Sequence, residues 1–401
     1  MSDTQFMRLA LRLARRGYGT TSPNPMVGAV LVKGGKIIGC GWHRRAGGAH
    51  AEIEAFRDAA KRGHSPRGAT LIVTLEPCCT HGRTPPCTEA IIAARIKRVV
   101  VGAVDPNPQH RGRTFKILRR AGVEVVSIDE ESEARGKGRA TEEKLAAECA
   151  RLNEAFNHWI VHRTPFVTVK AAMTLDGKIA TASGESKWIT GEKARACGMK
   201  LRQGSDAILV GVNTVLTDDP SLTVRLGQSP ASKTQRPRLR RIVLDALART
   251  PLAAKVVSDE RAELTTMVVS GRAPKSRVTA LAKRVNVLVA PLTKRRARSD
   301  APHQIDLRWL LRKLGAENVT SLLVEGGGEV NASFLCGGLA HRVAFFYAPK
   351  ILGGRNSRKA VAGAGVKRLG DVILLHDLEW RRLGKDLWLL ARIKQRGRGR
   401  V

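Results

Sequence analysis

Hydrophobic and polar positions in the first third of the chain follow two periods, one helical and one extended. Phe6, Leu9 and Leu13 recur at the spacing of one helix face and predict an amphipathic helix near the N-terminus. Short apolar runs bounded by turn residues predict strands, and Gly34-Gly35 predicts a hairpin turn. The expected elements are strands at 27–33, 36–42, 69–75, 98–104 and 123–128, and helices at 50–61, 86–94 and 115–121. Strands that alternate with helices are typical of an α/β sandwich.

The pattern is interrupted once and then restarts. Residues 130–143 are charged and contain glycine, which predicts an inserted loop or linker, and a helix is expected at 144–160. After Pro165 the expected elements are strands at 166–172, 207–210, 241–245, 266–269, 285–289, 321–325 and 342–348, and helices at 191–203, 303–314 and up to Cys336. We therefore expect a first domain at 1–145, a linker helix at 146–164 and a second α/β domain at 165–401.

Composition is that of a globular chain with several domains. The 401 residues are 43% hydrophobic, but no apolar run approaches the about 20 residues that a membrane helix needs, so no membrane partner is expected. Cys78, Cys79 and Cys87 cluster, while the other cysteines are scattered. This distribution favours a reducing compartment, the cytoplasm, and one metal site over a disulfide framework.

The formal charge of +35 suggests a nucleic-acid partner at first sight. The lysines and arginines are nevertheless spread over the whole chain, and few aromatic residues lie among them for base stacking. A generally solvated basic surface is therefore the favoured interpretation, and a nucleic-acid partner is not expected. A phosphorylated substrate would need only a few of these charges.

Three short stretches combine into one predicted metal site. An H-A-E triplet contains His50 and Glu52, a P-C pair ends at Cys78, and Cys87 follows. An H-x-E followed by P-C and a second cysteine is the signature of zinc-dependent deaminases. His50, Cys78 and Cys87 would be three ligands of a tetrahedral zinc, with the fourth position left for water. Glu52 would take a proton from that water and pass it to the leaving ammonia.

The spacing of the cysteines leaves alternatives open. Eight residues separate Cys78 from Cys87, whereas nucleobase deaminases in general use P-C-x-x-C. Cys79 or His81 could replace a neighbouring ligand. A structural zinc site is a further alternative, but the missing fourth protein ligand and the nearby Glu52 argue against it.

Several segments of the chain resemble one family. They are TTSPNPMVGAVLV, GAHAE, LEPCCTHGRTPPC, DPNPQHRGR, VKAAMTLDGKIATASGESKWIT and ILVGVNTVLTDDPSLTVR. In this order they closely resemble the bifunctional riboflavin biosynthesis proteins, over nearly the full chain apart from 130–143. The resemblance implies a cytidine-deaminase-like α/β/α sandwich followed by a dihydrofolate-reductase-like α/β domain.

The resemblance also implies two reactions and their cofactors. The first is zinc-dependent hydrolytic deamination of a phosphorylated pyrimidine, 2,5-diamino-6-(5-phosphoribosylamino)pyrimidin-4-one. The second is NADPH-dependent reduction of the ribosyl group, which gives 5-amino-6-(5-phosphoribitylamino)uracil. Family spacing favours Cys78 and Cys87 as ligands and leaves Cys79 as a bystander. Asn24, Asp105 and Asn107 would contact the deaminase substrate, although Asn and Asp beside Pro also serve turns well.

The second domain has no G-x-G-x-x-G at the start of a helix, so a Rossmann fold is not expected. The best phosphate-binding candidate is the segment 326–329, between a strand and a helix, which could equally be a tight turn. Family matching places five residues at the substrate: Ser186, Arg202, Leu222, Arg225 and Glu325. It places eleven at the cofactor: Ala172, Trp188, Thr214, Asp218, Gly327, Gly328, Glu329, Val330, Asn331, Ala332 and Ser333.

Three of these residues carry a chemical expectation, and one further position departs from the family. Arg202 and Arg225 suit a phosphate clamp, because guanidinium pairs with phosphate in a bidentate manner. Asp218 could assist proton transfer, or it could cap a helix or turn. Ala246 stands where the family has a serine beside the cofactor, which puts the strength of NADPH binding in question.

The leading hypothesis is thus a homo-oligomeric enzyme, a dimer or tetramer, with two active sites. The alternative is a basic zinc deaminase that acts on nucleic acid and has a non-catalytic C-terminal domain. A third hypothesis keeps the second domain only as a structural or dimerisation partner.

Overall fold

The computed structural model describes residues 2–81, 85–128, 139–225, 239–293 and 305–394. By its internal contacts the chain forms two compact units, Met1–Arg163 and Thr164–Val401. In the described part of the chain, no helix has both the length and the apolar character needed to cross a bilayer. Residues 82–84, within the family-like segment between the two predicted cysteine ligands, lie outside the described residues, as does much of the predicted insert at 130–143.

A five-stranded sheet forms the centre of the first unit, in the order β2-β1-β3-β4-β5. The strands are β1 (Gly28–Lys33), β2 (Lys36–Trp42), β3 (Thr70–Val73), β4 (Arg98–Val101) and β5 (Glu124–Ser127). β1 pairs antiparallel with β2 and β3, whereas β3, β4 and β5 are parallel. Parallel neighbours require crossover connections, and helices between these strands supply them.

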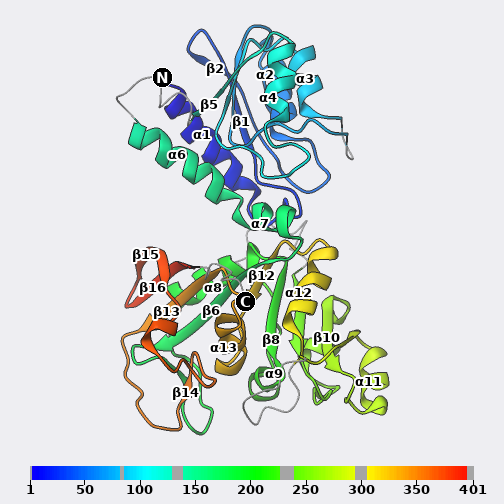
Figure 1. Ribbon diagram of the computed structural model, residues 1–401, viewed down its shortest axis with the longest axis vertical. Coiled ribbons are helices and arrows are strands. Elements are labelled where there is room, and N and C mark those ends of the chain that lie inside the picture. Colours follow the sequence, from blue (N-terminus) through cyan, green and yellow to red (C-terminus); the bar gives the residue numbers. More distant parts are fainter. Residues whose placement is uncertain (1, 82–84, 129–138, 226–238, 294–304, 395–401) are drawn as a thin grey trace. The chain divides into compact units, whose positions relative to one another are not determined.

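Helices cover both faces of this sheet (Figure 1). The helices of this unit are α1 (Asp3–Ala14), η1 (Arg15–Gly17), α2 (Ala51–Lys61), α3 (Cys87–Ala93), α4 (Arg113–Arg120), α6 (Arg139–Leu152) and α7 (Glu154–His162). On one face α2, α3 and α4 bury Ala55, Ile91 and Leu118 against the sheet. On the other face α1 and α6 bury Leu11 and Cys149. The predicted α/β/α sandwich is confirmed.

Two glycines in β2 allow α2 to lie directly on the sheet. A side-chain carbon at Gly39 would stand 2.5 Å from the carbonyl oxygen of Ala55, and one at Gly41 would stand 2.3 Å from that of Ala51. Both distances are far shorter than van der Waals contact, so only glycine fits there. The close packing fixes the first turn of α2, where two predicted site residues, His50 and Glu52, are found.

The region expected to be one linker helix consists of two helices. α6 begins at Arg139 rather than at residue 144 and ends at Leu152. Asn153 interrupts the helix and is the N-cap of α7. Asn153 is buried, and its side chain accepts from the Met26 N–H at 2.8 Å and donates to the Met26 carbonyl at 2.9 Å. This pair of bonds to a distant loop explains the break, which local helical periodicity does not indicate. Both helices belong to the first unit.

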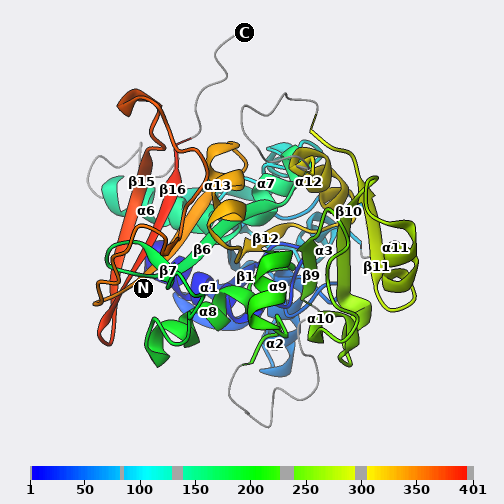
Figure 2. The same cartoon turned by 90° about the horizontal axis from the view of Figure 1, so that it is seen from below.

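The second unit is built on a nine-stranded sheet in the order β11-β10-β9-β8-β12-β6-β13-β16-β15. Its strands are β6 (Phe166–Thr174), β8 (Ala207–Gly211), β9 (Arg240–Leu244), β10 (Thr265–Ser270), β11 (Asn286–Ala290), β12 (Ser321–Val324), β13 (Arg342–Ala348), β15 (Leu375–Leu383) and β16 (Asp386–Ile393). The first seven in sheet order are parallel, and β16 and β15 complete the sheet in antiparallel pairing at one end (Figure 2). A separate two-stranded sheet pairs β7 (Lys178–Ala180) with β14 (Arg358–Lys359).

Two helical layers cover the long sheet. The helices are α8 (Glu192–Gln203), α9 (Val212–Asp218), α10 (Lys255–Ser258), α11 (Lys275–Ala282), α12 (Leu307–Ala316) and α13 (Gly328–Cys336), with short 3-10 turns at Ala262–Leu264 and Leu369–Asp371. Leu310 and Phe334 belong to one apolar core, and Val215 and Leu281 belong to another. The predicted second α/β domain is confirmed. Sequence patterns did not indicate the β15–β16 hairpin, because most of β15 is exposed and lacks a clear apolar alternation.

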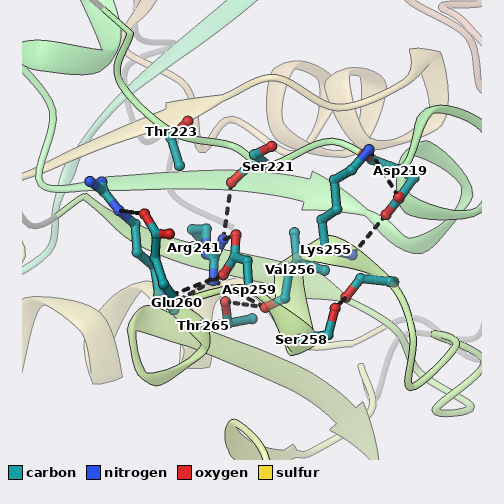
Figure 3. Close-up of polar contacts among 12 residues, drawn as sticks. Asp219, Ser221, Thr223, Arg241, Lys255, Val256, Ser258, Asp259, Glu260 and Thr265 are labelled. Carbon is teal, nitrogen blue, oxygen red and sulfur yellow. Dashed lines mark hydrogen bonds and ion pairs between the residues drawn. The ribbon is translucent and has the colours of Figure 1, made fainter.

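A fully buried arginine ties several segments of the second unit together (Figure 3). Arg241 on β9 is 1% exposed, and its two Nη atoms pair with the Asp259 carboxylate at 2.7 and 2.8 Å. The same guanidinium donates to the backbone carbonyls of Ser221, Val256 and Arg261. Because Ser221 precedes Leu222 and Arg225, this cluster fixes the backbone of a segment predicted to contact substrate.

We expect Arg241→Met to destabilise the second unit by about 3 kcal/mol, because it removes the charged partner of the partly buried Asp259 carboxylate and one donor from each of three carbonyls. Urea unfolding at neutral pH measures the effect. Arg240→Met is the matched control. Arg240 pairs with Glu317 at the surface, and its loss should cost less than about 1 kcal/mol. Equal effects of the two changes would contradict the role given to Arg241.

Two candidate active sites

Three side chains that commonly bind metal come together in the first unit from separate segments. His50 caps the start of α2, Cys78 follows β3, and Cys87 is the first residue of α3. Their ligand atoms lie within 4.8 Å of one another. In the described part of the chain, this is the group of His, Cys and acidic residues found to be able to hold a metal ion.

The distances in this group match a tetrahedral zinc. His50 Nδ1 lies 3.2 Å from Cys87 Sγ and 3.5 Å from Cys78 Sγ. With Zn–N and Zn–S bonds of ordinary length, tetrahedral ligand atoms stand about 3.5 Å apart. The three residues therefore fit zinc by donor type, number and spacing, and they leave the fourth position to a non-protein ligand.

The two alternative ligands contact other groups. Cys79 Sγ lies 3.9 Å from the Gln109 carbonyl oxygen and 3.6 Å from His110 Nδ1. His81 is exposed and lies 3.5 Å from the carboxylate of Glu89. Neither belongs to the group of three that the structure brings together.

The electrostatics of the group favour a thiolate that binds metal. Hydrogen bonding from the Cys87 side chain, together with His50, lowers the pKa of Cys78. The backbone N–H of Cys87 also donates to Cys78 Sγ at 3.3 Å. Glu52 lies in the first turn of α2 and is 3% exposed, and this burial raises the pKa of its carboxyl. A raised pKa suits a group that takes up and releases a proton near neutral pH.

A cavity of about 310 Å³ opens beside the metal group. Its lining includes all the residues that the sequence predicts to contact the deaminase substrate or to transfer a proton in deamination: Asn24, Glu52, Asp105 and Asn107. Burial raises the pKa of Asp105 to about 6. The Asp105 carboxylate also accepts from the Asn107 backbone N–H at 2.8 Å, so these two residues form one local unit.

Several lining residues were not indicated by the sequence patterns. Phe156, Trp159 and Ile160 of α7 form an apolar wall of the cavity. His43 lines it from the end of β2, where Nδ1 lies 3.0 Å from the Ala49 carbonyl and Nε2 lies 3.2 Å from Asn24 Nδ2. These partners assign Nδ1 as donor and Nε2 as acceptor, and burial lowers the pKa of His43, so its ring is neutral. A polar residue just after a predicted strand is the only signal that could have indicated His43.

The second unit contains a buried ion cluster at the predicted substrate site. Glu325 follows β12, and its carboxylate pairs with Arg202 Nε and Nη2 at 2.9 Å each and with Lys170 Nζ at 3.4 Å. Burial raises the pKa of Glu325, but the charges of Arg202 and Lys170 outweigh it and lower that pKa to about 2. Arg202 also donates to the Thr223 carbonyl. Three of its five N–H donors thus have protein partners, which leaves Arg202 less free to clamp a phosphate than Arg225.

The other predicted residues of this site come from α9, from the segment that follows it and from the segment 186–188 before α8. Ser186 Oγ donates to Asp218 Oδ1 at 3.3 Å, which joins a predicted substrate residue to the predicted proton-transfer residue. Leu222 is buried in an apolar core, so only part of it could contact a ligand. Arg225 and Trp188 are both exposed. Thr214 is half-buried within α9.

The start of α13 has features that suit a phosphate group of a dinucleotide. Gly327 is the N-cap, no side chain caps the helix, and the space where a Cβ of Gly327 would stand is open. A Cβ at Gly328 would lie 2.3 Å from the Lys359 carbonyl oxygen, so this turn requires glycine. Asn331 is fully buried, and its Oδ1 has no partner in the structure. The uncapped N–H groups and open space fit the predicted cofactor segment.

Two family models match the chain. Residues 1–103 match the cytidine and deoxycytidylate deaminase zinc-binding region, and residues 165–389 match the RibD C-terminal domain. With the metal group and the fold, these matches define a zinc-binding deaminase of the cytidine deaminase class that is joined to a reductase domain.

Individual relatives extend the match over the whole chain. Riboflavin biosynthesis protein RibD of Actinobacillus pleuropneumoniae is 41% identical, over 97% of this chain and 95% of its own length. The solved structure of Acinetobacter baumannii RibD, form 1, has a TM-score of 0.79 and 34% identity, over 98% of this chain and 99% of that chain. A diaminohydroxyphosphoribosylaminopyrimidine deaminase/5-amino-6-(5-phosphoribosylamino)uracil reductase from Thermotoga maritima has a TM-score of 0.76 and 34% identity over the same shares. The chain belongs to the RibD family of bifunctional riboflavin biosynthesis proteins, as predicted.

We expect Glu325→Gln to destabilise the second unit by about 3 kcal/mol at pH 7 and by progressively less in acid. The folded pKa of about 2 lies below the ordinary value of 4.5, so the ionised group stabilises the fold above about pH 4.5. That contribution is lost as the pH falls towards 2. Urea midpoints of both proteins at pH 7 and pH 3.5 measure the difference. Glu317→Gln is the control, because Glu317 belongs to a half-exposed ion pair at the surface. If the difference in urea midpoint between wild type and Glu325→Gln did not change with pH, the lowered pKa of Glu325 would be contradicted.

Proposed function

We propose that this protein deaminates 2,5-diamino-6-(5-phosphoribosylamino)pyrimidin-4-one and then reduces the ribosyl group of the product, which yields 5-amino-6-(5-phosphoribitylamino)uracil. Residues 1–163 would carry the deamination and residues 164–401 the reduction. The observation that carries the proposal is the buried acid Glu52 beside His50, Cys78 and Cys87, in a cavity that opens on all of them but Cys87.

In the deaminase half, His50, Cys78 and Cys87 would hold zinc, which when bound makes water a nucleophile at neutral pH. The Glu52 carboxylate would take a proton from the attacking water and deliver it to the departing amino group, and its raised pKa suits this role. Asn24, Asp105 and Asn107 orient the ring by hydrogen bonds from the walls of the same cavity. The apolar residues of α7 exclude bulk water from one side of it.

In the reductase half, NADPH when bound supplies the hydride for the sugar carbon that carries the ring nitrogen, after the furanose has opened. We assign Glu325 and Ser186 to the substrate and Asp218 to proton transfer, with Arg202 and Lys170 as the charges that keep Glu325 ionised. The cofactor would lie along the following residues: Ala172, Trp188, Thr214, Asp218 and Gly327 to Ser333. Leu222 and Arg225 would contact the substrate chain and its phosphate.

The cellular compartment, the binding partner and the assembly can also be proposed. All seven cysteines lie in the described part of the chain and none is in a disulfide, which supports a reducing compartment such as the cytoplasm. The partner is a phosphorylated pyrimidine rather than nucleic acid, and a homodimer or tetramer is the expected assembly.

Incubating the purified protein with zinc, NADPH and the diaminopyrimidinone ribosyl phosphate tests the proposal. We expect ammonia release without NADPH, and NADPH oxidation only after deamination has produced the intermediate. Ammonia release with no NADPH oxidation on the deaminated intermediate would overturn the second activity. It would favour a second unit that serves only as a structural partner. Deamination of single-stranded nucleic acid instead of the nucleotide would favour the alternative function.

Glu52→Gln should lower the deamination rate by at least 10²-fold and leave the zinc content at one per chain, because the amide can neither accept nor return the proton. NADPH oxidation on supplied deaminated intermediate should be unchanged. Metal analysis and the two assays on one preparation measure these quantities. Glu54→Gln is the matched control, because Glu54 lies in the same helix turn and its carboxylate pairs with Arg44 and Arg57. Deamination by Glu52→Gln at the wild-type rate would remove Glu52 from the mechanism.

A further inference from the structure

Two residues before the predicted ligand Cys78 lies a carboxylate whose hydrogen bonds, within the described residues, come from the backbone. Glu76 is 3% exposed, and its two oxygens accept from three backbone N–H groups. Oε2 accepts from Asp105 at 3.2 Å and from Gly112 at 3.1 Å, and Oε1 accepts from Thr114 at 3.2 Å. A buried carboxylate with three charge-assisted bonds is a strong anchor for the backbone that donates to it.

The three donors lie at the two ends of one segment, residues 105–114. Asp105 begins the segment, in the loop that follows β4. Gly112 has φ +71° and is the N-cap of α4, and Thr114 lies in the first turn of that helix. The carboxylate of Glu76 therefore closes the segment into a loop and caps α4, in the way that an acidic side chain stabilises a helix start. Asp105 and Asn107, the predicted substrate contacts, lie within this loop.

Further bonds join the same loop to the segment that carries the metal ligand. The Glu76 backbone N–H donates to the Ala103 carbonyl at 2.9 Å, and Thr114 Oγ1 donates to the Pro77 carbonyl at 2.6 Å. The Cys79 backbone N–H donates to His110 Nδ1 at 3.2 Å. Bonds thus connect residues 76–79 with residues 103–114 on both sides of Cys78.

The ring of His110 makes a second contact to this segment. Its Nε2 lies 3.3 Å from Thr80 Oγ1, and because Nδ1 accepts from Cys79, the ring is assigned as the Nε2–H tautomer. His110 is buried and also lines the cavity. The ring therefore connects the loop 105–114 with residues 79–80, which follow the predicted ligand Cys78.

We propose that Glu76 is a positioning residue for deamination, which holds the substrate loop 105–114 at a fixed place relative to the segment that carries Cys78. This inference rests on the proposed deaminase activity. It gives a role to Glu76, which is not among the predicted site residues. Its basis is geometric: three N–H groups converge on one carboxylate, which has room for about four hydrogen bonds. A glutamine has one oxygen and would turn its NH₂ group towards at least one of these donors, so the loop would lose part of its anchor.

Glu76→Gln tests the proposal in the full-length protein with zinc bound. We expect KM for deamination to rise at least tenfold and kcat to change less than threefold, because Asp105 and Asn107 move while the metal group and Glu52 remain. Zinc should stay at one per chain, and reduction of the deaminated intermediate should be within twofold of the wild type. Glu124→Gln is the matched control, since Glu124 is a surface residue of β5 in the same unit, and it should leave both activities unchanged.

A pair of changes at His110 keeps the proposal testable if Glu76→Gln does not fold. His110→Asn retains an acceptor near the position of Nδ1 and should keep KM within threefold, whereas His110→Ala removes it and should raise KM about tenfold. Equal KM values in these two variants, or a wild-type KM in Glu76→Gln, would overturn the loop-positioning role. Loss of zinc from Glu76→Gln would also overturn it, because Glu76 would then support the metal ligands. A wild-type protein without deamination would overturn the proposed function itself.

Discussion

The deaminase unit depends on how closely α2 lies on β2. Gly39 and Gly41 remove the two side-chain carbons that would hold the helix away, so backbone meets backbone at the centre of that contact. The helix start then has one position above the sheet, and His50 and Glu52 take theirs from it. The two cysteines come from other segments, Cys78 from the loop after β3 and Cys87 from the start of α3. If α2 moved away from the sheet by the width of one side chain, Glu52 and His50 would move away from the two cysteines. The three ligand atoms would then no longer lie within bonding distance of one ion.

In both units, buried charged side chains form hydrogen bonds with the backbone of the segments that we propose to contact substrate. In the first unit, a carboxylate accepts the N–H groups at both ends of the loop 105–114. In the second, Arg241 binds the carbonyl of Ser221, and Arg202 binds that of Thr223 while it pairs with Glu325. Backbone held in this way needs no rearrangement when a ligand binds, which is how preorganised sites are supported. Leaving any of these charged groups without its partner would lower the free energy of unfolding. The fixed conformation of each segment and the stability of its unit therefore depend on the same bonds.

The sequence predicts what is encoded locally. The metal group could be predicted because histidine, glutamate and the P-C pair lie in short motifs at helix and strand ends, and the sandwich could be predicted from alternating periods. Contacts over long sequence separation could not. The break between α6 and α7 depends on the bond of Asn153 to Met26, and the partner of Arg202 is Glu325, more than a hundred residues away. An arginine that suits a phosphate clamp by its chemistry turns out to have most of its donors committed to the protein. Only the folded chain shows which of its charges remain available to a ligand.

The wall that α7 contributes to the deaminase cavity has a consequence for how the two activities can be divided between genes. Phe156, Trp159 and Ile160 come after the last strand of the five-stranded sheet and directly before the chain enters the second unit at Thr164. A gene split at the end of the sandwich proper would encode a protein with an intact metal group and an open-sided cavity. A stand-alone deaminase descended from such a chain must therefore either keep this helix or close the same side by another route. The point where the two halves can be separated lies after the wall, within the few residues that precede β6.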